Sequence, residues 1–367
     1  MTIERRFCYS RRWNDHWGYP RSLAGAPPRG WSYRPASISM DPRRGRPWCR
    51  FHARDGEIIH ASSLIPTNRS PWVLDTDHAA YLLLQTAGAF NGGRRKVPAT
   101  EAARGIARAL ASPRCAGVLA WSAAARDSIV ALCEAEGVAP PRTSVVYPAV
   151  APPDPAEGGA GALASIAPVL GALSPGSVRF LMVDGQIGVC ARPGRKNLAA
   201  GVRCVRELRR RGVDAELVVV APSEPLFRDE PWLHVLPHIP RAALWALYGA
   251  VDVLLFLSRQ DSFGYVILEA MHHGLCCIAA TGPSVPAVGE ILAHGETGLL
   301  LPSPPGAPYP AFSRGPSHHA LLEQAYAAAT DAALRRRIGA AARRETRDGG
   351  RFSPEHRNAA LERVLRG

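Results

Sequence analysis

From residue 178 onward, short apolar segments alternate with longer segments whose apolar residues recur at helical spacing. The strands are predicted at 178–183, 216–220, 234–236, 251–256, 275–280 and 298–301. The helices are predicted at 197–212, 241–248, from about 264, and at 317–346. Strands that alternate with helices in this way build a parallel sheet covered by helices. This half of the chain is therefore predicted to be an α/β domain of Rossmann-like type.

The first half of the chain shows the same alternation less clearly. Its strands are predicted at 57–61, 72–75, 117–121 and 145–147, and its helices at 79–90, 100–110 and 122–136. Residues 1–50 are rich in Arg, Pro, Gly and Trp and show neither periodicity, so loops with one short strand are predicted there. At 367 residues the chain is longer than one hydrophobic core usually serves, which favours two α/β domains.

The positive charge of the chain is unevenly distributed. Residues 1–150 hold 21 Arg and Lys against 11 Asp and Glu, a balance of +10, and the remainder of the +13 lies in the rest of the chain. A basic surface attracts an anionic membrane face, an acidic acceptor or nucleic acid, although a solvated arginine-rich surface explains it equally well. Only Lys96 and Lys196 are lysines, which draws attention to Lys196.

Several observations bear on location and on metal sites. No apolar run approaches the ~20 residues of a membrane span, and residues 1–12 lack the apolar segment of a secretory signal. The eight cysteines never fall in a C-x-x-C spacing, so they are predicted to be reduced thiols and no zinc site is expected. The prediction is a cytoplasmic protein, with a possible peripheral contact at the inner membrane face.

The stretch 258-SRQDSFGYVILEAMHHG-274 carries the clearest chemistry. A helix is predicted to begin near Gly264, and its unpaired N–H groups form a site for a phosphate or a sugar oxygen. Asp261 and Glu269 flank this helix start, so the two carboxylates can line one cleft. Other polar clusters follow predicted strands at His78, at 192–196 and at 281–283, where parallel sheets bind ligands. With two such domains, the ligand is expected in the cleft between them.

These residues resemble a known family. Asp261-Ser262-Phe263-Gly264 followed by Glu269-Ala270-Met271 is similar to the E-G-F-G-x-x-x-x-E-A-M pattern of retaining nucleotide-sugar glycosyltransferases with the GT-B fold. These are the family 4-like enzymes with an E-x7-E motif, also called glycosyl transferases group 1. Further blocks agree in order, namely 195-RKNL-198, 247-LY-248 before 251-VDV-253, 282-GP-283 with Pro286, and 295-GETGLL-300. The resemblance is specific from about 180 to 302, weaker at 71–78, 119–127 and 145–150, and absent from 1–50.

The resemblance implies a role for each matching residue. Asp261 would contact hydroxyls of the donor sugar, and Glu269 would bind the ribose hydroxyls. Lys196, with Arg192 or Arg195, would clamp the diphosphate and neutralise the leaving group. His78 would reach the donor sugar from the N-terminal domain. Backbone groups of the remaining positions would face the donor, and these are Ser262, Phe263, Gly264, Gly282 and Pro283.

The same resemblance implies a domain plan and a reaction. Two Rossmann-like domains would face each other across a cleft. The N-terminal domain, at 1–160, would have a trimmed start and bind the acceptor, and the domain at 178–346 would bind the donor. A linker at 161–177 would join them, and a helix at 347–367 would return to the N-terminal domain. The reaction would be metal-independent, front-face transfer of a hexosyl group with retention, needing no cofactor beyond a UDP- or GDP-sugar as substrate. A small molecule, a lipid-linked sugar or a polysaccharide could be the acceptor, and no specific nucleic acid is expected.

The sequence departs from the family pattern in ways that keep alternatives open. Asp261 is one methylene shorter than the usual Glu, and Ser262 replaces the usual Gly. Ala191 and Cys190 occupy the positions where the family often has its phosphate-binding Arg. A catalytically silent partner or binding subunit with the same fold is therefore the main alternative. A sugar-nucleotide epimerase and a basic nucleic-acid-binding protein are weaker ones.

Overall fold

The computed structural model describes residues 5–10, 23–41, 43–44, 46–86, 98–153, 160–184, 194–221, 230–304, 306, 308–347 and 349–366. The chain divides into two compact units. The first consists of Met1–Ala151 together with Arg351–Gly367, and the second is Pro152–Gly350. Within the described residues, no helix is long and apolar enough to cross a membrane.

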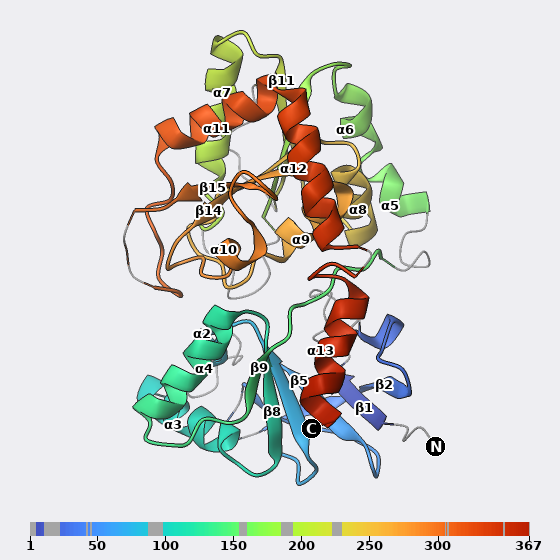
Figure 1. Ribbon diagram of the computed structural model, residues 1–367, viewed down its shortest axis with the longest axis vertical. Helices are drawn as coiled ribbons and strands as arrows, with labels where there is room; N and C mark the ends of the chain where they lie inside the picture. Colours follow the sequence, from blue (N-terminus) through green and yellow to red (C-terminus); the bar gives the residue numbers. More distant parts are fainter. Residues whose placement is uncertain are drawn as a thin grey trace. The chain divides into compact units, whose positions relative to one another are not determined.

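The first unit is built on a six-stranded sheet in the order β2-β1-β5-β7-β8-β9, and all of its pairings are parallel (Figure 1). Its strands are β1 (Arg5–Ser10), β2 (Trp31–Ala36), β5 (Ile58–Ser62), β7 (Trp72–Thr76), β8 (Cys115–Ala120) and β9 (Thr143–Val145). A smaller sheet consists of β3 (Ile38–Met40), β4 (Trp48–Phe51) and β6 (Ile65–Pro66).

The expectation of mostly loops in residues 1–50 is wrong. Four strands lie there, and β1 pairs with both β2 and β5 inside the sheet. The sequence of β1, RRFCYS, buries Phe7 and Cys8 next to each other beside polar residues, so it shows no period-two alternation. Residues 5–10 therefore form a strand because they pair with β2 and β5, and the local residue pattern does not predict it.

Helices α2 (Ala79–Leu84), α3 (Ala99–Leu110) and α4 (Ala123–Ala135) pack against the sheet of the first unit. The core between them contains aliphatic and aromatic side chains from both sheets and all three helices, including Trp48, Ile59, Trp72, Leu82, Ile106 and Ile129. Ser122 caps α4, with its Oγ accepting from Ala125 N at 3.0 Å. Helix α3 begins at Ala99, one residue before the predicted start.

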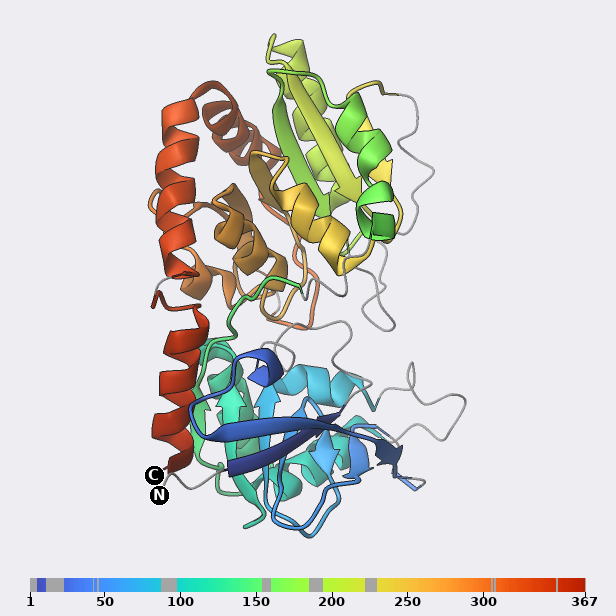
Figure 2. The same ribbon diagram turned by 90° about the vertical axis from the view of Figure 1, so that its right-hand side faces the viewer.

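The C-terminal helix α13 (Pro354–Arg366) belongs to the first unit. Arg357 on this helix is fully buried, and its Nη2 donates to the carbonyl oxygen of Ala26 at 2.7 Å. Asn358 Nδ2 donates to the same oxygen at 3.0 Å. Phe352, just before the helix, packs edge-on against Tyr147 with ring centroids 5.3 Å apart. In Figure 2 the helix is the red element that runs beside the strands of this unit.

Asp75 at the end of β7 holds a buried polar network together. Its Oδ2 lies 2.9 Å from His60 Nε2, and its Oδ1 accepts from Ser62 Oγ at 2.8 Å and from Trp121 Nε1 at 3.0 Å. We expect Asp75→Ala to lower the free energy of unfolding by about 3–5 kcal/mol, because the Ser62 hydroxyl and the Trp121 indole N–H lose their acceptor and His60 loses the carboxylate beside it. Urea unfolding measures this loss. Asp127→Ala, at an exposed ion pair with Arg126, should cost less than about 1 kcal/mol, and equal losses would contradict the importance of the network.

The second unit has a six-stranded sheet in the order β12-β11-β10-β13-β14-β15, again parallel throughout. Its strands are β10 (Val178–Val183), β11 (Ala215–Val220), β12 (Leu233–Leu236), β13 (Val253–Phe256), β14 (Cys276–Thr281) and β15 (Leu299–Pro302). Each was predicted to within two residues. The strands are rich in Val, Leu and Ile and are buried on both faces, which is typical of a parallel sheet between two helical layers.

The helices of the second unit are α5 (Ala160–Ala164), α6 (Ala167–Ala172), α7 (Leu198–Arg210), α8 (Arg241–Tyr248), α9 (Tyr265–His273), α10 (Val288–Ile291), α11 (His318–Thr330) and α12 (Ala332–Glu345). One core cluster joins the sheet to α7, α11 and α12. Residues 161–177, expected as a linker, instead contain α5 and α6 and cluster with this unit. The segment after α6 is bound to β11, because Glu216 on that strand accepts hydrogen bonds from Ser174 and Ser177. The helix expected at 317–346 is two helices, because Asp331 ends α11 and caps α12 through Leu334 N.

His272 and His273 end α9, and both rings pack against Trp245. The ring of His273 packs 4.6 Å from that of Trp245, and burial, followed by the positive charges of Arg347 and Arg343, lowers its pKa from 6.5 to about 4. Since the unfolded chain binds a proton between these two pH values and the folded chain does not, stability should fall as the pH is lowered from 7 to 4.

We expect His273→Gln to flatten this pH dependence, since it removes one of the depressed histidines. Thermal unfolding between pH 7 and pH 4 measures the slope. The control is His319→Gln, at an exposed position on α11. A slope that changes equally in the two variants would show that burial of His273 does not govern it.

Candidate functional site

The strand order of the second unit defines where a ligand can bind. The chain leads from β10 outward to β11 and β12, and then returns to β13 on the other side of β10. The strand order therefore reverses between β10 and β13. In open parallel sheets, ligands bind outside the carboxyl ends of the strands at such a reversal.

Residues from these two loops meet at this position. Lys196 follows β10 and Asp261 follows β13, and the Lys196 Nζ donates to Asp261 Oδ2 at 2.5 Å although 65 residues separate them. The Lys196 ammonium also lies 4.8 Å from the centre of the Phe256 ring, at the end of β13. Both contacts fix the one lysine that the sequence singled out.

Arg195 completes a small cluster of opposite charges. Its Nη1 donates to Asp261 Oδ2 at 3.3 Å, and its Nη2 lies 3.8 Å from Asp184 Oδ1 at the end of β10. Two cations thus share two carboxylates, with their side chains largely buried. Of the two arginines left open by the sequence, Arg195 lies with Lys196, whereas Arg192 lies outside the described residues.

Burial and neighbouring charge act in opposite directions on this cluster. Burial raises the pKa of the Asp261 carboxyl. The positive charges of Lys196 and Arg195 together lower it by more, so the pKa lies below its usual value. Burial lowers the pKa of Lys196, and Asp261 offsets part of that effect. The cluster is therefore an ion-paired site in which each cation depends on an anionic partner.

The backbone holds the two loops against each other. Asn197 begins α7 in a left-handed conformation with φ of 55°, which turns the chain directly after Lys196. Arg259 N donates to the carbonyl oxygen of Arg195 at 2.8 Å, and Asp261 N donates to that of Ser284 at 3.1 Å. The second bond brings the loop after β14 beside Asp261.

That loop contains the predicted Gly282 and Pro283. Gly282 has φ of 146° and bridges to Val285, which makes a tight reversal at the end of β14. The carbonyl oxygen of Pro283 accepts from Tyr309 N at 2.9 Å. Both residues therefore lie next to the Asp261 loop, with their backbone ordered by the chain around them.

Helix α9 begins immediately after Gly264, as predicted. Gly264 has φ of 90°, and a Cβ there would lie 3.0 Å from Ile267 Cδ1 and 3.3 Å from Phe256 Cζ. Only glycine fits this turn. Phe263 N donates to Asp261 Oδ1 at 3.3 Å, so Ser262 and Phe263 form the short connection between the carboxylate and the helix.

Glu269 faces a different neighbour. It lies one turn into α9 and is buried against α8, where Tyr248 Oη donates to its Oε2 at 3.0 Å and Arg241 Nε lies 3.5 Å from its Oε1. Burial raises the pKa of Glu269, and Arg241 and Tyr248 offset part of this effect. Asp261 thus precedes α9 and Glu269 lies within it, each with its own set of partners.

His78 lies in the first unit, at the carboxyl end of β7. It caps α2, with Nδ1 accepting from Ala80 N at 3.1 Å. Burial lowers its pKa to about 4, so the ring is neutral at pH 7 with its proton on Nε2. A neutral imidazole in this tautomer is a hydrogen-bond donor for an oxygen ligand.

Sequence comparison assigns the central part of the second unit. Residues 185–308 match the family described as Glycosyl transferases group 1. This segment is similar to the group 1 glycosyltransferase domain. Over 54 residues the chain is also 44% identical to N-acetyl-alpha-D-glucosaminyl L-malate synthase from Bacillus anthracis. That alignment spans 15% of this chain and 13% of the Bacillus enzyme.

Solved structures resemble nearly the whole chain. WaaG, a glycosyltransferase involved in lipopolysaccharide biosynthesis, is 17% identical with a TM-score of 0.58, and the match covers 99% of this chain and 100% of WaaG. Sucrose-phosphate synthase from Thermosynechococcus elongatus is 14% identical with a TM-score of 0.62, covering 99% and 98%. Anabaena HepE in complex with UDP-glucose is 14% identical with a TM-score of 0.56, covering 98% and 99%. The predicted α/β fold with parallel sheets, matching the GT-B glycosyltransferases, is confirmed.

The sequence did not single out Asp184, Arg241 or Tyr248 as members of the site. Tyr248 was noted only as part of a family block, and its contact with Glu269 depends on how α8 packs on α9. Asp184 ends a predicted strand, and this position was a signal that could have identified it. Among the described residues, no cluster of three or more His, Cys, Asp or Glu side chains is arranged to hold a metal ion.

Proposed function

We propose that this protein transfers a sugar from a nucleoside diphosphate sugar to an acceptor hydroxyl. One observation supports this most strongly: Lys196 and Asp261, from loops far apart in sequence, meet at the carboxyl ends of β10 and β13 inside the group 1 domain. Anabaena HepE has been crystallised with UDP and with UDP-glucose, which favours a UDP- or GDP-sugar as the donor here.

The proposed mechanism assigns the diphosphate to the cation pair. As the glycosidic bond breaks, negative charge develops on the departing diphosphate, and Lys196 and Arg195 stabilise it. The N–H groups at the start of α9, next to Gly264, add partial positive charge on the same side. In this proposal the transfer is metal-independent and retains the anomeric configuration, with the leaving phosphate accepting the proton of the acceptor hydroxyl on the same face.

The remaining residues would position the donor. Glu269 would accept hydrogen bonds from the ribose hydroxyls, and Asp261 would turn from Lys196 to the sugar when the diphosphate takes over the cation. His78 would donate from Nε2 to the sugar, and the backbone of Gly282 and Pro283 would line the site. These roles place the donor on the second unit and the acceptor on the first, consistent with a domain organisation of the GT-B type.

A silent binding subunit is the second candidate. Its supporting observation is that Asp261, in place of the usual Glu, forms an ion pair with Lys196. A transferase would hydrolyse or transfer the donor sugar, whereas a binding subunit would only bind the donor. We expect a panel of nucleotide sugars that includes UDP-glucose to raise the melting temperature and to be slowly hydrolysed. Stabilisation without hydrolysis or transfer across broad acceptors would favour the binding subunit, and no stabilisation at all would refute the donor site.

A further inference from the structure

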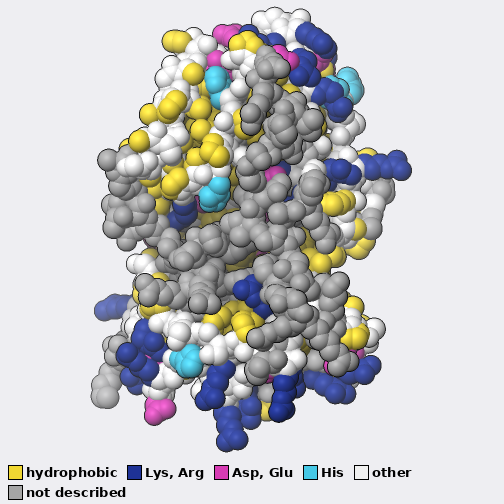
Figure 3. Space-filling model, turned by 180° about the vertical axis from the view of Figure 1, so that it is seen from behind, with side chains coloured by type: hydrophobic (Ala, Val, Ile, Leu, Met, Phe, Trp, Pro, Cys, Tyr) yellow, Lys and Arg dark blue, Asp and Glu magenta, His cyan; other side chains and the backbone are white. Residues whose placement is uncertain are grey.

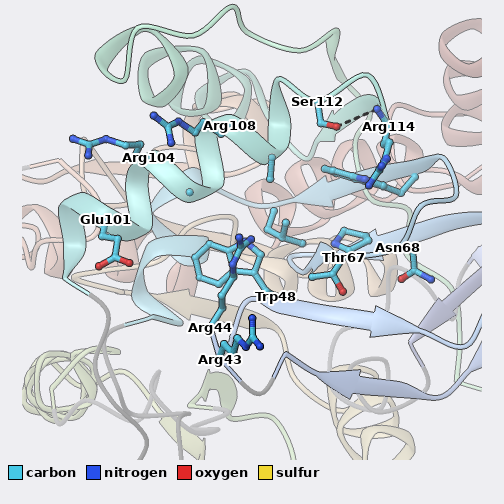
Figure 4. Close-up of a pocket in the computed structure, with 15 residues that line it drawn as sticks. Arg43, Arg44, Trp48, Thr67, Asn68, Glu101, Arg104, Arg108, Ser112 and Arg114 are labelled. Carbon is cyan, nitrogen blue, oxygen red and sulfur yellow. Dashed lines mark hydrogen bonds between the residues drawn. The ribbon is translucent and has the colours of Figure 1, made fainter.

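We propose that the first unit contains a second anion-binding pocket, which takes a ligand carrying two or more phosphate groups. The pocket is a cavity of about 620 Å³ between α3, β4, β6 and the starts of β7 and β8 (Figure 4). Cavities of this size accommodate small-molecule ligands. The inference concerns a site apart from the proposed transferase site and stands without it.

The lining combines an apolar floor with a cationic rim. Its buried members are apolar, and these are Trp48, Ile65, Pro66 and Trp72. Its exposed rim carries Arg43, Arg44, Arg104, Arg108 and Arg114 against a single carboxylate, that of Glu101. Five positive charges and one negative charge around one cavity favour a ligand with several negative charges over a neutral or singly charged one.

The arginines come from three separate parts of the chain. Figure 4 shows Arg104 and Arg108 on α3 to one side of Trp48 and Arg114 on the other, with Arg43 and Arg44 from the turn before β4. That turn is ordered by Asp41, whose Oδ1 accepts from the backbone N of Arg43 at 2.8 Å and of Arg44 at 2.9 Å. Convergence of this kind is a property of the fold, since no basic run in the sequence produces it. Figure 3 shows that Lys and Arg side chains are numerous on the first unit, in the lower part of the view.

The arrangement is unfavourable without a counter-charge. Arg104 and Arg108 lie four residues apart on α3, where like charges destabilise a helix. Arg104 is 3.7 Å from Glu136, but its side chain is 60% exposed, so that pair compensates little. The guanidinium of Arg44 lies 6.0 Å from the centre of the Trp48 ring. A polyphosphate would satisfy these groups, since guanidinium binds phosphate oxygens through paired hydrogen bonds.

Trp48 belongs to the apolar floor of this cavity, and its side chain is 3% exposed.

The pocket lies away from the edge of the sheet that carries His78. Trp72 begins β7 and His78 follows its end, and Arg114 immediately precedes β8. Because β7 and β8 are parallel, Trp72 and Arg114 mark the amino edge of the sheet and His78 the carboxyl edge. A ligand in this pocket would therefore bind apart from His78.

Calorimetric titration of the whole chain with inorganic tripolyphosphate at about 150 mM salt tests the proposal, because this ionic strength screens loose surface attraction. All variants carry Lys196→Ala as well, which weakens binding at the proposed diphosphate site. We expect one bound tripolyphosphate per chain, and a Kd that rises at least about tenfold on adding Arg108→Gln with Arg114→Gln. The matched control, Arg126→Gln with Arg142→Gln, makes the same change of charge at exposed positions of the first unit outside the pocket.

The outcomes separate clearly. Absence of binding, or equal weakening in the pocket and control variants, would overturn the proposal. Sedimentation with vesicles of phosphatidylcholine and phosphatidylglycerol identifies the source of the phosphate groups. Vesicle binding that is lost with Arg108 and Arg114 would assign them to lipid headgroups, whereas tripolyphosphate binding without vesicle binding would assign them to a free ligand.

Discussion

Lys196→Ala is expected to lower kcat/KM for donor hydrolysis and transfer by at least about 100-fold. The magnitude is that of losing one preorganised charge at a position where negative charge develops. The ammonium lies 2.5 Å from Asp261 Oδ2 and 4.8 Å from the Phe256 ring centre, and the only other lysine in the sequence is Lys96. Turnover of UDP-glucose and the other donors of the panel, with and without acceptors, measures the loss.

Two further variants separate charge from geometry. Lys196→Arg keeps the charge but places a planar group where only 9% of the side chain is exposed, so we expect partial activity at most. Arg210→Ala, on a 70% exposed side chain of α7, is the control and should leave turnover unchanged. Full activity in Lys196→Ala would remove the cation pair from the mechanism.

Glu269→Gln is expected to weaken nucleoside diphosphate binding by about tenfold to a hundredfold, because an amide replaces one acceptor oxygen by a donor. Tyr248 and Arg241 both point hydrogen-bond donors at this carboxylate, so the variant also leaves one of them poorly matched. Titration calorimetry with UDP and GDP measures the affinity. Glu323→Gln, at a 51% exposed position of α11, is the matched control.

The ribose assignment allows a sharper comparison. If Glu269 binds the ribose hydroxyls, the unmodified protein should prefer UDP or GDP over the 2′-deoxy form, and Glu269→Gln should reduce this preference. A purely structural role of Glu269 would weaken both nucleotides equally. Such an outcome would assign Glu269 to the packing of α9 on α8.

The second unit was predictable from sequence because local signals and packing agree there. Strands such as β10 and β11 are continuous apolar runs, and α9 starts at a glycine that no other residue can replace. The family-like blocks added the functional reading, and the fold that they imply is confirmed. Loops that follow neighbouring parallel strands meet at one edge, which is why Lys196 and Asp261 could be placed near each other from the sequence.

Two kinds of feature could not be predicted. The strands within residues 1–50 lack periodicity, because β1 is defined by its pairing with β2 and β5. Contacts such as Tyr248 with Glu269, or the convergence of arginines around Trp48, depend on the angle and distance between packed elements. Neither the strand pairing nor these contacts produce a residue pattern that can be recognised in the sequence. The roles of Asp261, Glu269 and His78 toward a sugar remain predictions for the experiments above.

Titration calorimetry of the intact protein with UDP and GDP, alongside Lys196→Ala, tests the central claim most directly. We expect one of the two nucleotides to bind with one site per chain, and its affinity to fall at least about tenfold in Lys196→Ala. Absence of binding by both nucleotides, or equal affinity in the two proteins, would contradict a nucleoside diphosphate site at the carboxyl ends of β10 and β13.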